Sequence, residues 1–576
     1  MISLSRKYRA PVAVGGVILF FLFIISNISS HEGSHPKCAS TLSKQSDVAP
    51  SRCIIEGTKR VQCYRDGKDV YLPFDGFLKK QFDLTGRLIN KGETDERFEY
   101  FTSYAKVRTP ERLDYSPTAE FGNFRTYSVE FRDRVRCISA EYGVPMSTQW
   151  DTVPYFYPIQ IAQYALQHYS RNVTDKAPKI VELEAEFDPS NGQKEVIADA
   201  DGGLRLKLDP RPDFATISFS WKPADPSAAF SVTVEVLRLN KTITLIYKHV
   251  DDRRCVWAEG DVLSDTYGDG EDSPVNVEAK NKQELVFAYA LGTSIDPSQF
   301  TTVVRDILVD TSKGLALVQL LPLTRKESSL PGGLKIGDVK LLSLSFSGRS
   351  TLKRPIRQMT SAHGEIFLRT ADWFVTNQDE QGGWPVPVMR SIADNKLVLP
   401  AGWHSAMAQG HALSVLTRAY FLTKDIRYVN AAAASLSLFE TPALEGGVMN
   451  KLFNHPWYEE YPTTPGSFVL NGFMYGLVGL YDFSTVIPHG NASKKLFDDG
   501  INSLKTFLPL YDTGFGSVYD LRHLGLKTAP NIARWDYHAV HIYLLKWLNT
   551  ITNEKFFDEV AERWIGYATG KRAKHN

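Results

Sequence analysis

The hydrophobic and polar residues between about residues 180 and 350 alternate with a period of two. Three runs of alternating hydrophobic residues stand out: Ile217, Phe219 and Trp221; Val232, Val234 and Val236; and Leu342, Leu344 and Phe346. Because successive side chains of a strand point to opposite faces, these runs predict half-buried strands. Turn residues separate the runs at short intervals, which predicts a β-sandwich or barrel domain at residues 176–355. No cluster of catalytic residue types falls there, so we interpret it as an accessory or carbohydrate-binding domain.

From about residue 356 the hydrophobic period becomes that of an α-helix. Leu413, Leu416 and Tyr420 fall at positions i, i+3 and i+7, and Leu496–Leu504 repeats that spacing. Asn553 is expected to cap a final helix, because a short polar side chain can accept a hydrogen bond from the first turn. That helix would carry three hydrophobic residues on one face: Phe556, Val560 and Trp564.

A weak internal repeat connects these helical stretches. They end in the glycine-rich turns Gln381–Pro385, Glu445–Asn450 and Thr513–Val518, which lie about 65 residues apart. One helical hairpin per repeat with a glycine turn is typical of an α/α toroid, and we predict an incomplete α/α barrel at residues 356–576 as the catalytic domain. In such a fold the turns line a central cavity.

The N-terminal part has the pattern of a membrane-anchored protein. Arg6, Lys7 and Arg9 precede an apolar run from Pro11 to Ile28 that is long enough to span a bilayer. We predict a single-pass type II protein of the Golgi membrane with its catalytic domain in the lumen; the alternative is a cleaved signal peptide. The predicted parts are a cytosolic tail (1–10), a transmembrane anchor (11–28), a stem (29–60) and an N-terminal β-hairpin domain (61–175), which the hairpin signal Asp66-Gly67 opens.

Composition and charge argue against some classes of binding partner. The 576 residues are 43% hydrophobic and carry a formal charge of +1, without a basic tail or zinc-ligand spacing, so we predict no nucleic-acid partner. The five cysteines form no C-x-x-C pair, which favours one or two disulfides and an odd thiol over metal or redox chemistry. Four glycosylation sequons suit a lumenal glycoprotein: Asn27, Asn172, Asn240 and Asn491.

Three segments near the C-terminus place tyrosines beside acids and bases. They are Trp457–Tyr475, Ser517–His523 and Asn531–His541. Because the pKa of tyrosine is near 10, several tyrosines in one polar pocket indicate tuned acid-base groups. The predicted toroid would bring the three segments together.

Each segment allows a functional and a structural interpretation. Glu460 and Tyr461 lie in a proline-rich loop, where the acid is either a solvated turn residue or a proton-transfer group whose pKa an anionic substrate raises. Tyr519 and Arg522 would share a helical face, where the guanidinium would lower the pKa of the phenol and bind a carboxylate. The structural alternative is that Arg522 pairs with Asp520 or Asp512.

The third segment and an upstream strip leave similar alternatives. The spacing of His538 and His541 could suggest a metal, but no third ligand is evident, so acid-base chemistry is favoured and His538 could equally be a packed polar residue. Alternation of Arg132, Arg134 and Arg136 would place them on one side of a strand, as a groove for a sulfated or carboxylated polymer or as a solvated face.

Long motifs resemble those of one enzyme family. The motifs Gly402–Gly410, Asn454–Pro465, Phe468–Tyr475, Leu508–Gly514, Tyr519–His523, Ala533–His538 and Lys571–Asn576 are similar to those of the heparosan-N-sulfate-glucuronate 5-epimerases, or D-glucuronyl C5-epimerases. The similarity is dense from about residue 360 to the end, recognisable from Tyr127 to Asn172 and weak across the middle domain.

The resemblance implies a Golgi isomerase of heparan sulfate and heparin synthesis. It implies a heparosan polysaccharide substrate, a homodimer, contact with other heparan sulfate enzymes, no cofactor for catalysis and a structural Ca²⁺ near Glu184. The catalytic residues that it implies are Glu460, Tyr461, Tyr519, Tyr537, Tyr127 and Tyr169. The substrate-binding residues that it implies are Arg132, Arg134, Thr148, Gln149, Tyr157, Gln160, Asn471, Tyr475, Arg522, Asn531, Arg534, Trp535, Asp536 and His538. The loop Ser391–Asp394 matches a substrate loop in position but differs in its residues.

Epimerisation at C5 fits this residue set. It requires two acid-base groups on opposite faces of the sugar and a cation for the enolate-like intermediate. We assign the faces to Glu460 and Tyr537, the carboxylate to Arg522 and Tyr519, and ring positioning or a share in the proton relay to Tyr461. The alternatives are a polysaccharide lyase, which begins with the same proton removal, and a non-catalytic Golgi heparan-binding scaffold.

Overall fold

A computed structural model describes most of the chain. The described residues are 49–55, 59–66, 69–73, 84–89, 97–102, 114–183, 195–198, 203–259, 285–293, 296–318, 320, 333–488 and 490–574. The predicted tail, the anchor, most of the stem and Glu184 lie outside them. No helix within the described ranges is long and apolar enough to cross a membrane. The chain divides into two compact units, one with Cys63–Tyr71 and one with Leu72–Asn576.

The N-terminal strands form small antiparallel pairs. A three-stranded sheet contains β1 (Ala49–Ile55), β2 (Lys59–Asp66) and β3 (Asp69–Tyr71). Asp66 pairs with Asp69, which confirms the predicted hairpin. The strands β4 (Leu84–Ile89) and β5 (Arg97–Thr102) form a second antiparallel pair.

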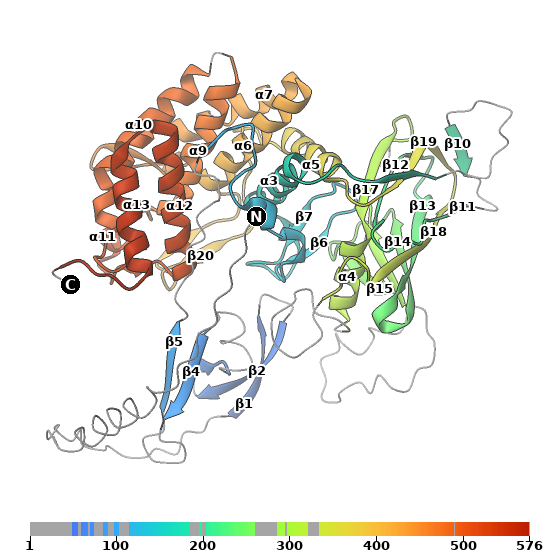
Figure 1. Cartoon of the computed structure of the whole chain (residues 1–576), viewed down its shortest axis with the longest axis horizontal. Helices are drawn as coiled ribbons and strands as arrows, with labels where there is room; N and C mark the ends of the chain where they lie inside the picture. Colours follow the sequence, from blue (N-terminus) through green and yellow to red (C-terminus); the bar gives the residue numbers. More distant parts are fainter. Residues whose placement is uncertain are drawn as a thin grey trace, which may run out of the picture. The chain divides into compact units, whose positions relative to one another are not determined.

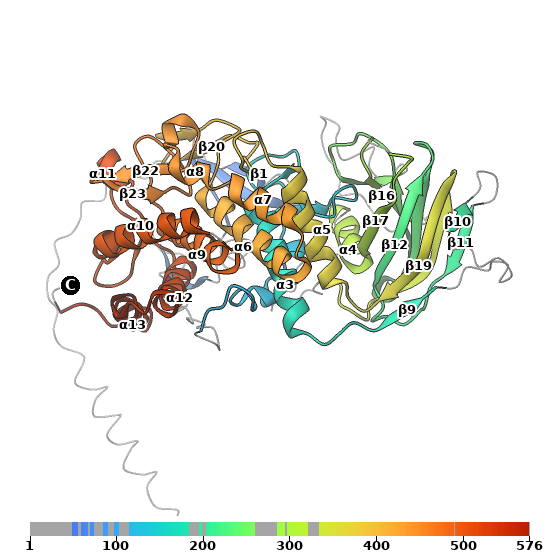
Figure 2. The ribbon, with the colours of Figure 1, turned by 90° about the horizontal axis from the view of Figure 1, so that it is seen from above.

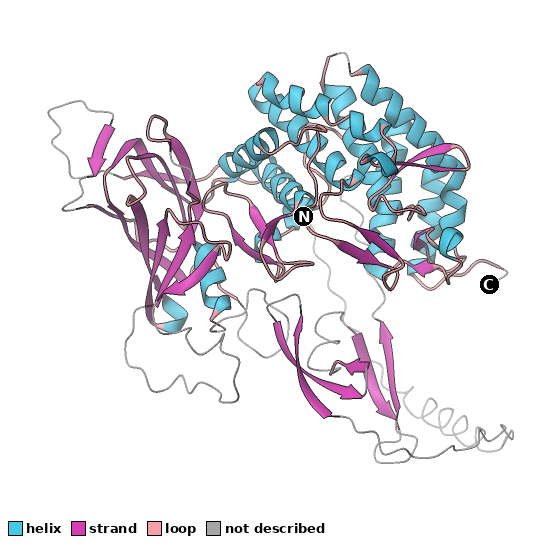
Figure 3. Cartoon of the chain, turned by 180° about the vertical axis from the view of Figure 1, so that it is seen from behind, coloured by secondary structure: helices cyan, strands magenta, loops and turns pink. Residues whose placement is uncertain are grey.

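The middle region is a β-sandwich, as its alternation predicts. One sheet has the order β10-β19-β12-β17 with β9 on β19, and the other has the order β11-β18-β13-β14-β16-β15 (Figures 2 and 3). The faces share one core, in which Phe219 of the first sheet packs at 5.2 Å against Phe230 and Phe346 of the second. The elements are β9 (Ile180–Glu182), β10 (Glu195–Ala198), β11 (Leu204–Lys207), β12 (Thr216–Pro223), β13 (Ala229–Val236), β14 (Lys241–Lys248), β15 (Val256–Glu259), β16 (Leu285–Ala290), β17 (Thr301–Asp306), α4 (Ile307–Leu317), β18 (Val339–Ser347) and β19 (Ser350–Met359).

The predicted alternation fails at Leu342. Leu344 and Phe346 are buried, but Leu341 is buried in place of Leu342. The pairing of β13 with β18 shifts register between Thr233 and Val234, which leaves Leu342 as the extra residue of a bulge. A bulge reverses the side-chain alternation on one side of it, and the period of two could not reveal that.

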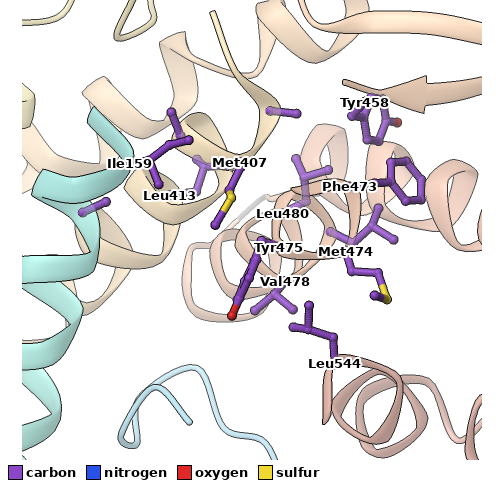
Figure 4. Close-up of a cluster of buried hydrophobic side chains, with 14 of the residues drawn as sticks. Ile159, Met407, Leu413, Tyr458, Phe473, Met474, Tyr475, Val478, Leu480 and Leu544 are labelled. Carbon is purple, nitrogen blue, oxygen red and sulfur yellow. The ribbon is translucent and has the colours of Figure 1, made fainter. Parts of the chain in front are cut away.

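The C-terminal region is mainly helical (Figure 1). Its helices are α5 (His363–Thr376), α6 (Ala406–Thr423), α7 (Ile426–Ala434), α8 (Ser437–Glu440), α9 (Leu470–Val486), α10 (Asn491–Phe507), α11 (His523–Leu526), α12 (Trp535–Thr552) and α13 (Lys555–Ala568). Helices α6 and α9 can approach closely because Gly479 has no side chain. A Cβ atom at that position would overlap the backbone of Gly410. Figure 4 shows Leu413 of α6 and Phe473 and Leu480 of α9 in the shared core. Helix α3 (Pro158–Thr174) contributes to the same core through Ile161 and Leu166.

Three short hairpins connect these helices. Each lies at or near one of the predicted glycine-rich turns in the sequence. They are β20 (Arg390–Ile392) with β21 (Leu397–Leu399), β22 (Met449–Leu452) with β23 (His455–Tyr458), and β24 (Val518–Asp520) with β25 (Asn531–Ile532). The helical periods of α6 and α10 are confirmed, since Leu413, Leu416 and Leu504 are fully buried. The toroidal arrangement and the domain boundaries stay predictions.

The predicted cap of the last helix is wrong. Asn553 adopts a left-handed conformation with φ 56° and ends α12, while Glu554 occupies the N-cap of α13. Asparagine tolerates this conformation well, so the same residue type serves a helix end as readily as a start. The buried face of α13 also differs by one residue, because Phe557 is buried and Phe556 only partly so.

A disulfide joins Cys137 and Cys255, 118 residues apart. Cys137 lies in β6 (Val135–Ile138), which forms a small sheet with β7 (Pro145–Ser147) and β8 (Tyr155–Phe156). Cys53 and Cys63 are also disulfide-bonded. The prediction of disulfides is therefore confirmed.

Candidate active site

The centre of the site is Glu460, which follows β23 in a non-helical loop, as predicted from Pro462 and Pro465. The side chain is 4% exposed. The Nδ2 of Asn471 donates to its Oε2 at 3.2 Å, and the hydroxyl of Tyr519 donates to its Oε1 at 3.4 Å. Both distances are at the long end for hydrogen bonds, so these two bonds stabilise the carboxylate only weakly.

Burial raises the pKa of Glu460 to about 7, although hydrogen bonds from Tyr461, Tyr519 and Asn471 act in the opposite direction. The raised pKa agrees with the functional interpretation of the loop, but its main cause is desolvation rather than a bound anion. A carboxyl group that titrates near neutrality can accept and return a proton at working pH.

A ring of tyrosines surrounds this carboxylate. Its members are Tyr157, Tyr461, Tyr475, Tyr519 and Tyr537. Burial raises the pKa of every one of these phenols, and the negative charge of Glu460 raises each pKa further. The rings of Tyr519 and Tyr537 meet edge to face with centroids 4.8 Å apart. The phenols are therefore neutral at pH 7, so each keeps its proton while Glu460 is charged.

The expectation that Arg522 lowers the pKa of Tyr519 is wrong. Tyr519 lies in β24 and Arg522 precedes α11, so the two do not share a helical face. The Nε of Arg522 lies 3.5 Å from Asp520, which also accepts a 2.8 Å bond from Asn531. The pKa of Tyr519 is raised by burial and by the charges of Glu460 and Asp520, among others.

The predicted strand does not align Arg132, Arg134 and Arg136, since only Arg136 lies in β6. Arg132 and Arg134 precede β6 in a turn, so alternation on a strand does not align them. Arg132 donates to Gln163 at 2.7 Å and lies 5.3 Å from the ring centroid of Tyr127. The charge of Arg134 opposes the rise in the pKa of Tyr157 and Tyr537. Arg134 therefore acts electrostatically on two tyrosines of the ring.

The other predicted residues divide into those near the ring and those apart from it. Tyr127 hydrogen-bonds Tyr475, and its ring stacks on Phe124 at 4.3 Å. Tyr169 is apart from the ring, because its hydroxyl donates to the carbonyl of Thr118 at 2.7 Å and Arg418 covers its face at 5.5 Å.

Two amide oxygens near the site lack hydrogen-bond partners among the described residues. Oδ1 of Asn471 and Oε1 of Gln160 are both buried and unpaired. A buried unpaired acceptor is destabilising by about 1–3 kcal/mol, so each is suited to receive a donor from a ligand. Thr148 is buried, and both its backbone N–H and its hydroxyl donate to the carbonyl of Arg134. The neighbouring Gln149 is partly exposed.

The start of α12 presents more polar groups. Arg534 forms an exposed ion pair with Asp536 at 3.2 Å, and its guanidinium lies 5.4 Å from the ring centroid of Tyr537. Trp535 is 43% exposed. These side chains are accessible, in contrast to the buried acid at the centre of the site.

His538 and His541 do not face the tyrosine ring. The hydroxyl of Ser517 contacts Nδ1 of His538 at 2.8 Å and Nδ1 of His541 at 2.9 Å, and Nε2 of His538 contacts the carbonyl of Trp564 at 3.1 Å. A carbonyl only accepts, so Nε2 of His538 carries a proton and its Nδ1 accepts from Ser517. His541 then donates its Nδ1 proton to Ser517. Burial lowers the pKa of both imidazoles, so both are neutral.

Metal ligation receives no support from this pair. Within the described ranges no group of three or more His, Cys, Asp or Glu side chains could hold a metal ion. The predicted calcium ligand Glu184 lies outside those ranges, so the calcium stays a prediction.

Two residues were missed by sequence reasoning. Glu459 is fully buried and accepts from Asn450 at 2.9 Å, Ser467 at 3.0 Å and the backbone of Phe468 at 2.8 Å, so it holds the loop that carries Glu460. Arg390 lies over Trp150 with its guanidinium 4.7 Å from the ring centroid. The only signal for Arg390 is that no acidic residue stands within three positions of it in the sequence.

The comparisons with known proteins agree with this site. Residues 378–566 match the family model described as D-glucuronyl C5-epimerase C-terminus. The chain is 44% identical over 569 residues to the D-glucuronyl C5-epimerase of Caenorhabditis elegans, and the alignment covers 91% of this chain and 90% of that protein. It is also 32% identical over 170 residues to an uncharacterized protein of Methanocaldococcus jannaschii, covering 29% of this chain and 53% of the relative.

A buried acid among neutral phenols, together with these similarities, defines an enzyme of the isomerase class. The chain belongs to the D-glucuronyl C5-epimerase family. The family predicted from the motifs is therefore confirmed.

Proposed function

We propose that this isomerase inverts C5 of D-glucuronate to give L-iduronate in N-sulfated heparosan, a step of heparan sulfate and heparin synthesis. The name of the Caenorhabditis elegans relative supports the glucuronate substrate. The observation that carries the mechanism is the buried Glu460, whose pKa is about 7, inside a ring of neutral tyrosines.

The first step is removal of the C5 proton. The carboxylate of Glu460 takes the proton, and the electron pair of the C5–H bond moves toward the uronate carboxylate as an enolate-like C5=C6 bond. Tyr519 and Arg522 bind that carboxylate and stabilise the developing charge. Arg522 is suited to this because its 3.5 Å contact with Asp520 is too long for a strong charge-assisted hydrogen bond.

The second step returns a proton to the opposite face. Tyr537 donates its phenolic proton to C5, and the electron pair of the C5=C6 bond forms the new C5–H bond. Once Glu460 has accepted the first proton its negative charge is gone, so the pKa of Tyr537 falls and the phenol becomes a better acid. Proton transfer with solvent returns both groups to their starting states after product release. Tyr461 positions the sugar ring or shares the relay.

The family resemblance also supports proposals about the location, the catalytic domain, the oligomeric state and the bound ion of the enzyme. We propose a type II Golgi enzyme, anchored by residues 11–28, with an α/α toroid at residues 356–576 as the catalytic domain. The proposal includes a homodimer that works beside other heparan sulfate enzymes, catalysis without a cofactor, and a structural calcium near Glu184. The 43% exposed Trp535 and the Arg534–Asp536 pair suit the rim of a polysaccharide groove.

The test is NMR of N-sulfated heparosan incubated with the detergent-solubilised full chain in D2O. Deuterium at C5 together with new iduronate signals supports the proposal. Chain cleavage with absorbance from an unsaturated uronate indicates a lyase. Salt-sensitive binding without exchange indicates a heparan-binding scaffold.

A further inference from the structure

An aromatic wall extends from the tyrosine ring to Arg390. The ring of Tyr461 lies 5.7 Å from that of Trp403, and Trp403 lies 6.2 Å from Trp150. Trp150 also contacts Tyr157 at 5.1 Å. The guanidinium of Arg390 covers Trp150 at the far end of this series. Aromatic side chains with a cation at their edge form a suitable surface for a sugar ring that carries an anionic group.

Arg390 is held in place by its hairpin. It pairs with Leu399 across β20 and β21, and Leu399 is 4% exposed in the main core. The connecting turn has positive φ at Ala393, Asp394 and Asn395. A side chain on a short, anchored strand keeps its position better than one on a loose loop.

Arg390 forms no ion pair with any acidic residue that the structure describes, and its buried Nε has no hydrogen-bond partner there. Two fully buried arginines are each paired with an acid: Arg305 with Asp310 at 2.6 Å, and Arg418 with Asp482 at 2.7 Å. A partly buried guanidinium without a counter-ion is unfavourable unless an anion binds to it.

The charge of Arg390 reaches the tyrosine ring. It opposes the rise in the pKa of Tyr461 and of Tyr155. The main influences on the pKa of Glu460 are instead burial, Tyr461, Tyr519, Asn471 and Asp520. Trp150, Trp403 and Tyr461 follow one another from Arg390 toward Glu460, so an anion on Arg390 would belong to a sugar beside the one that reacts at Glu460.

We propose that Arg390 binds an anionic group of a sugar that neighbours the epimerised uronate, either the sulfate of the adjoining glucosamine or the carboxylate of the next uronate, while Trp150 supports that sugar and the buried Trp403 backs Trp150. Arg390 is then a specificity-determining residue of the polysaccharide site. The inference rests on the proposed function for the identity of the reacting sugar, but the binding of an anionic sugar to this wall can be measured without turnover.

The experiment compares Arg390→Gln and Arg390→Lys with the unmodified full chain. The control is Arg211→Gln, which removes the same charge from an exposed pair with Asp209 in the β-sandwich. Affinity for N-sulfated and N-acetylated heparosan oligosaccharides is measured by calorimetry, and kcat and KM are measured by C5 deuterium exchange. Loss of a charge-assisted contact weakens binding by about 10- to 100-fold, so we expect that change in Kd and KM for Arg390→Gln with kcat nearly unchanged.

The two substrates identify the anion. If Arg390 binds a sulfate, the loss is confined to the N-sulfated oligosaccharide; if it binds a carboxylate, both oligosaccharides lose affinity equally. Arg390→Lys should recover part of the affinity, because it keeps the charge but not the planar fork. Unchanged Kd and KM for both substrates in Arg390→Gln, as in the Arg211→Gln control, would overturn the inference. Absence of exchange in the unmodified enzyme would instead count against the proposed function, and the affinities would still test Arg390.

Discussion

Two of the buried clusters that the structure describes combine a carboxylate with several tyrosines, and they differ in how completely the carboxylate is satisfied. In the β-sandwich, Asp310 is 1% exposed and accepts bonds from Arg305 at 2.6 and 2.9 Å and from Tyr247 at 2.6 Å. Arg305 also donates to the carbonyls of Ser139 and Ile138. Every strong donor has an acceptor, as expected of a cluster whose role is structural.

The cluster around Glu460 lacks this completeness. Its hydrogen bonds from Asn471 and Tyr519 are 3.2 and 3.4 Å long, Tyr461 supplies a third, and no cation among the described residues forms an ion pair with it. Oδ1 of Asn471 beside it has no partner among those residues. A buried acid that is left poorly satisfied costs stability, and proteins retain such groups mainly where a substrate completes them. The comparison therefore separates a structural cluster from a catalytic one.

The largest expected effect is that of Glu460→Gln. The amide keeps the shape of the side chain but cannot accept the C5 proton, so kcat for C5 exchange should fall by about 10⁴-fold or more. Deuterium exchange measured by NMR checks this, with binding of the oligosaccharide as the control. Exchange at the normal rate would remove Glu460 from the mechanism.

The same variant should raise stability at neutral pH. Glu460 has a pKa of about 7 when folded, against an ordinary value of 4.5, so the unfolded chain releases this proton first. The contribution of Glu460 to the free energy of unfolding therefore falls as the pH rises from about 4.5 to about 7. Glu460→Gln removes that loss, which amounts to about 3 kcal/mol at pH 8 and nearly zero at pH 4. Denaturant unfolding at the two pH values measures the difference.

Tyr537→Phe should have the next largest effect. The phenyl ring preserves the edge-to-face contact with Tyr519 but has no proton to return, so kcat should fall by about 10²- to 10⁴-fold with KM little changed. Tyr458→Phe is the matched control, because Tyr458 is buried and its hydroxyl donates to the carbonyl of Leu496 at 2.8 Å. An equal loss in both variants would show that removing a buried hydroxyl, rather than the acid, is responsible.

Asp310→Asn tests the conclusion that the cluster around Asp310 is structural. Removing the charge leaves Arg305 buried without its counter-ion, and breaking a buried pair in this way destabilises by about 3–5 kcal/mol. The midpoint of denaturant unfolding should fall, while the exchange rate per folded molecule stays the same. Asp209→Asn, which breaks the exposed pair with Arg211, is the control and should change the midpoint little. Loss of exchange in folded Asp310→Asn would contradict the division into structural and catalytic clusters.

The sequence predicts those features that depend on local patterns. The alternation of Ile217, Phe219 and Trp221 identifies β12, and the period of Leu413 and Leu416 identifies α6. The position of Glu460 in a loop follows from its prolines. Each of these features depends on residues close in the chain, where spacing and propensity are informative.

The predictions are wrong where the local structure depends on residues that are distant in the sequence. The bulge at Leu342 depends on the partner strand β13, and Arg522 turns to Asp520 because β24 replaces the expected helix. The direction of the pKa shift of Tyr519 depends on its burial and on the charges of Glu460 and Tyr537, which come from other parts of the chain and which no local pattern contains. Arg390 is informative only because tertiary structure leaves it without an acidic partner among the described residues.

Ser517→Ala should give the smallest effect and test how the two catalytic tyrosines are aligned. The hydroxyl of Ser517, beside β24, accepts from His541 and donates to His538, both on α12. It thereby joins the strand that carries Tyr519 to the helix that carries Tyr537. Without this hydroxyl, the buried Nδ1 donor of His541 and the buried Nδ1 acceptor of His538 both lose their hydrogen-bond partner. We expect kcat to fall by about tenfold with KM unchanged, since misplacing a proton donor slows the transfer without weakening binding.

Ser517→Thr keeps the hydroxyl and should restore most of this rate if the added methyl group is accommodated. The imidazole Nδ1 proton of His541 should be protected from solvent exchange in the unmodified enzyme and in Ser517→Thr, but not in Ser517→Ala. A tenfold loss of kcat in Ser517→Ala with that proton still protected would mean that the hydroxyl acts elsewhere. Unchanged kcat with the proton exposed would mean that β24 and α12 hold Tyr519 and Tyr537 in place through their apolar packing alone.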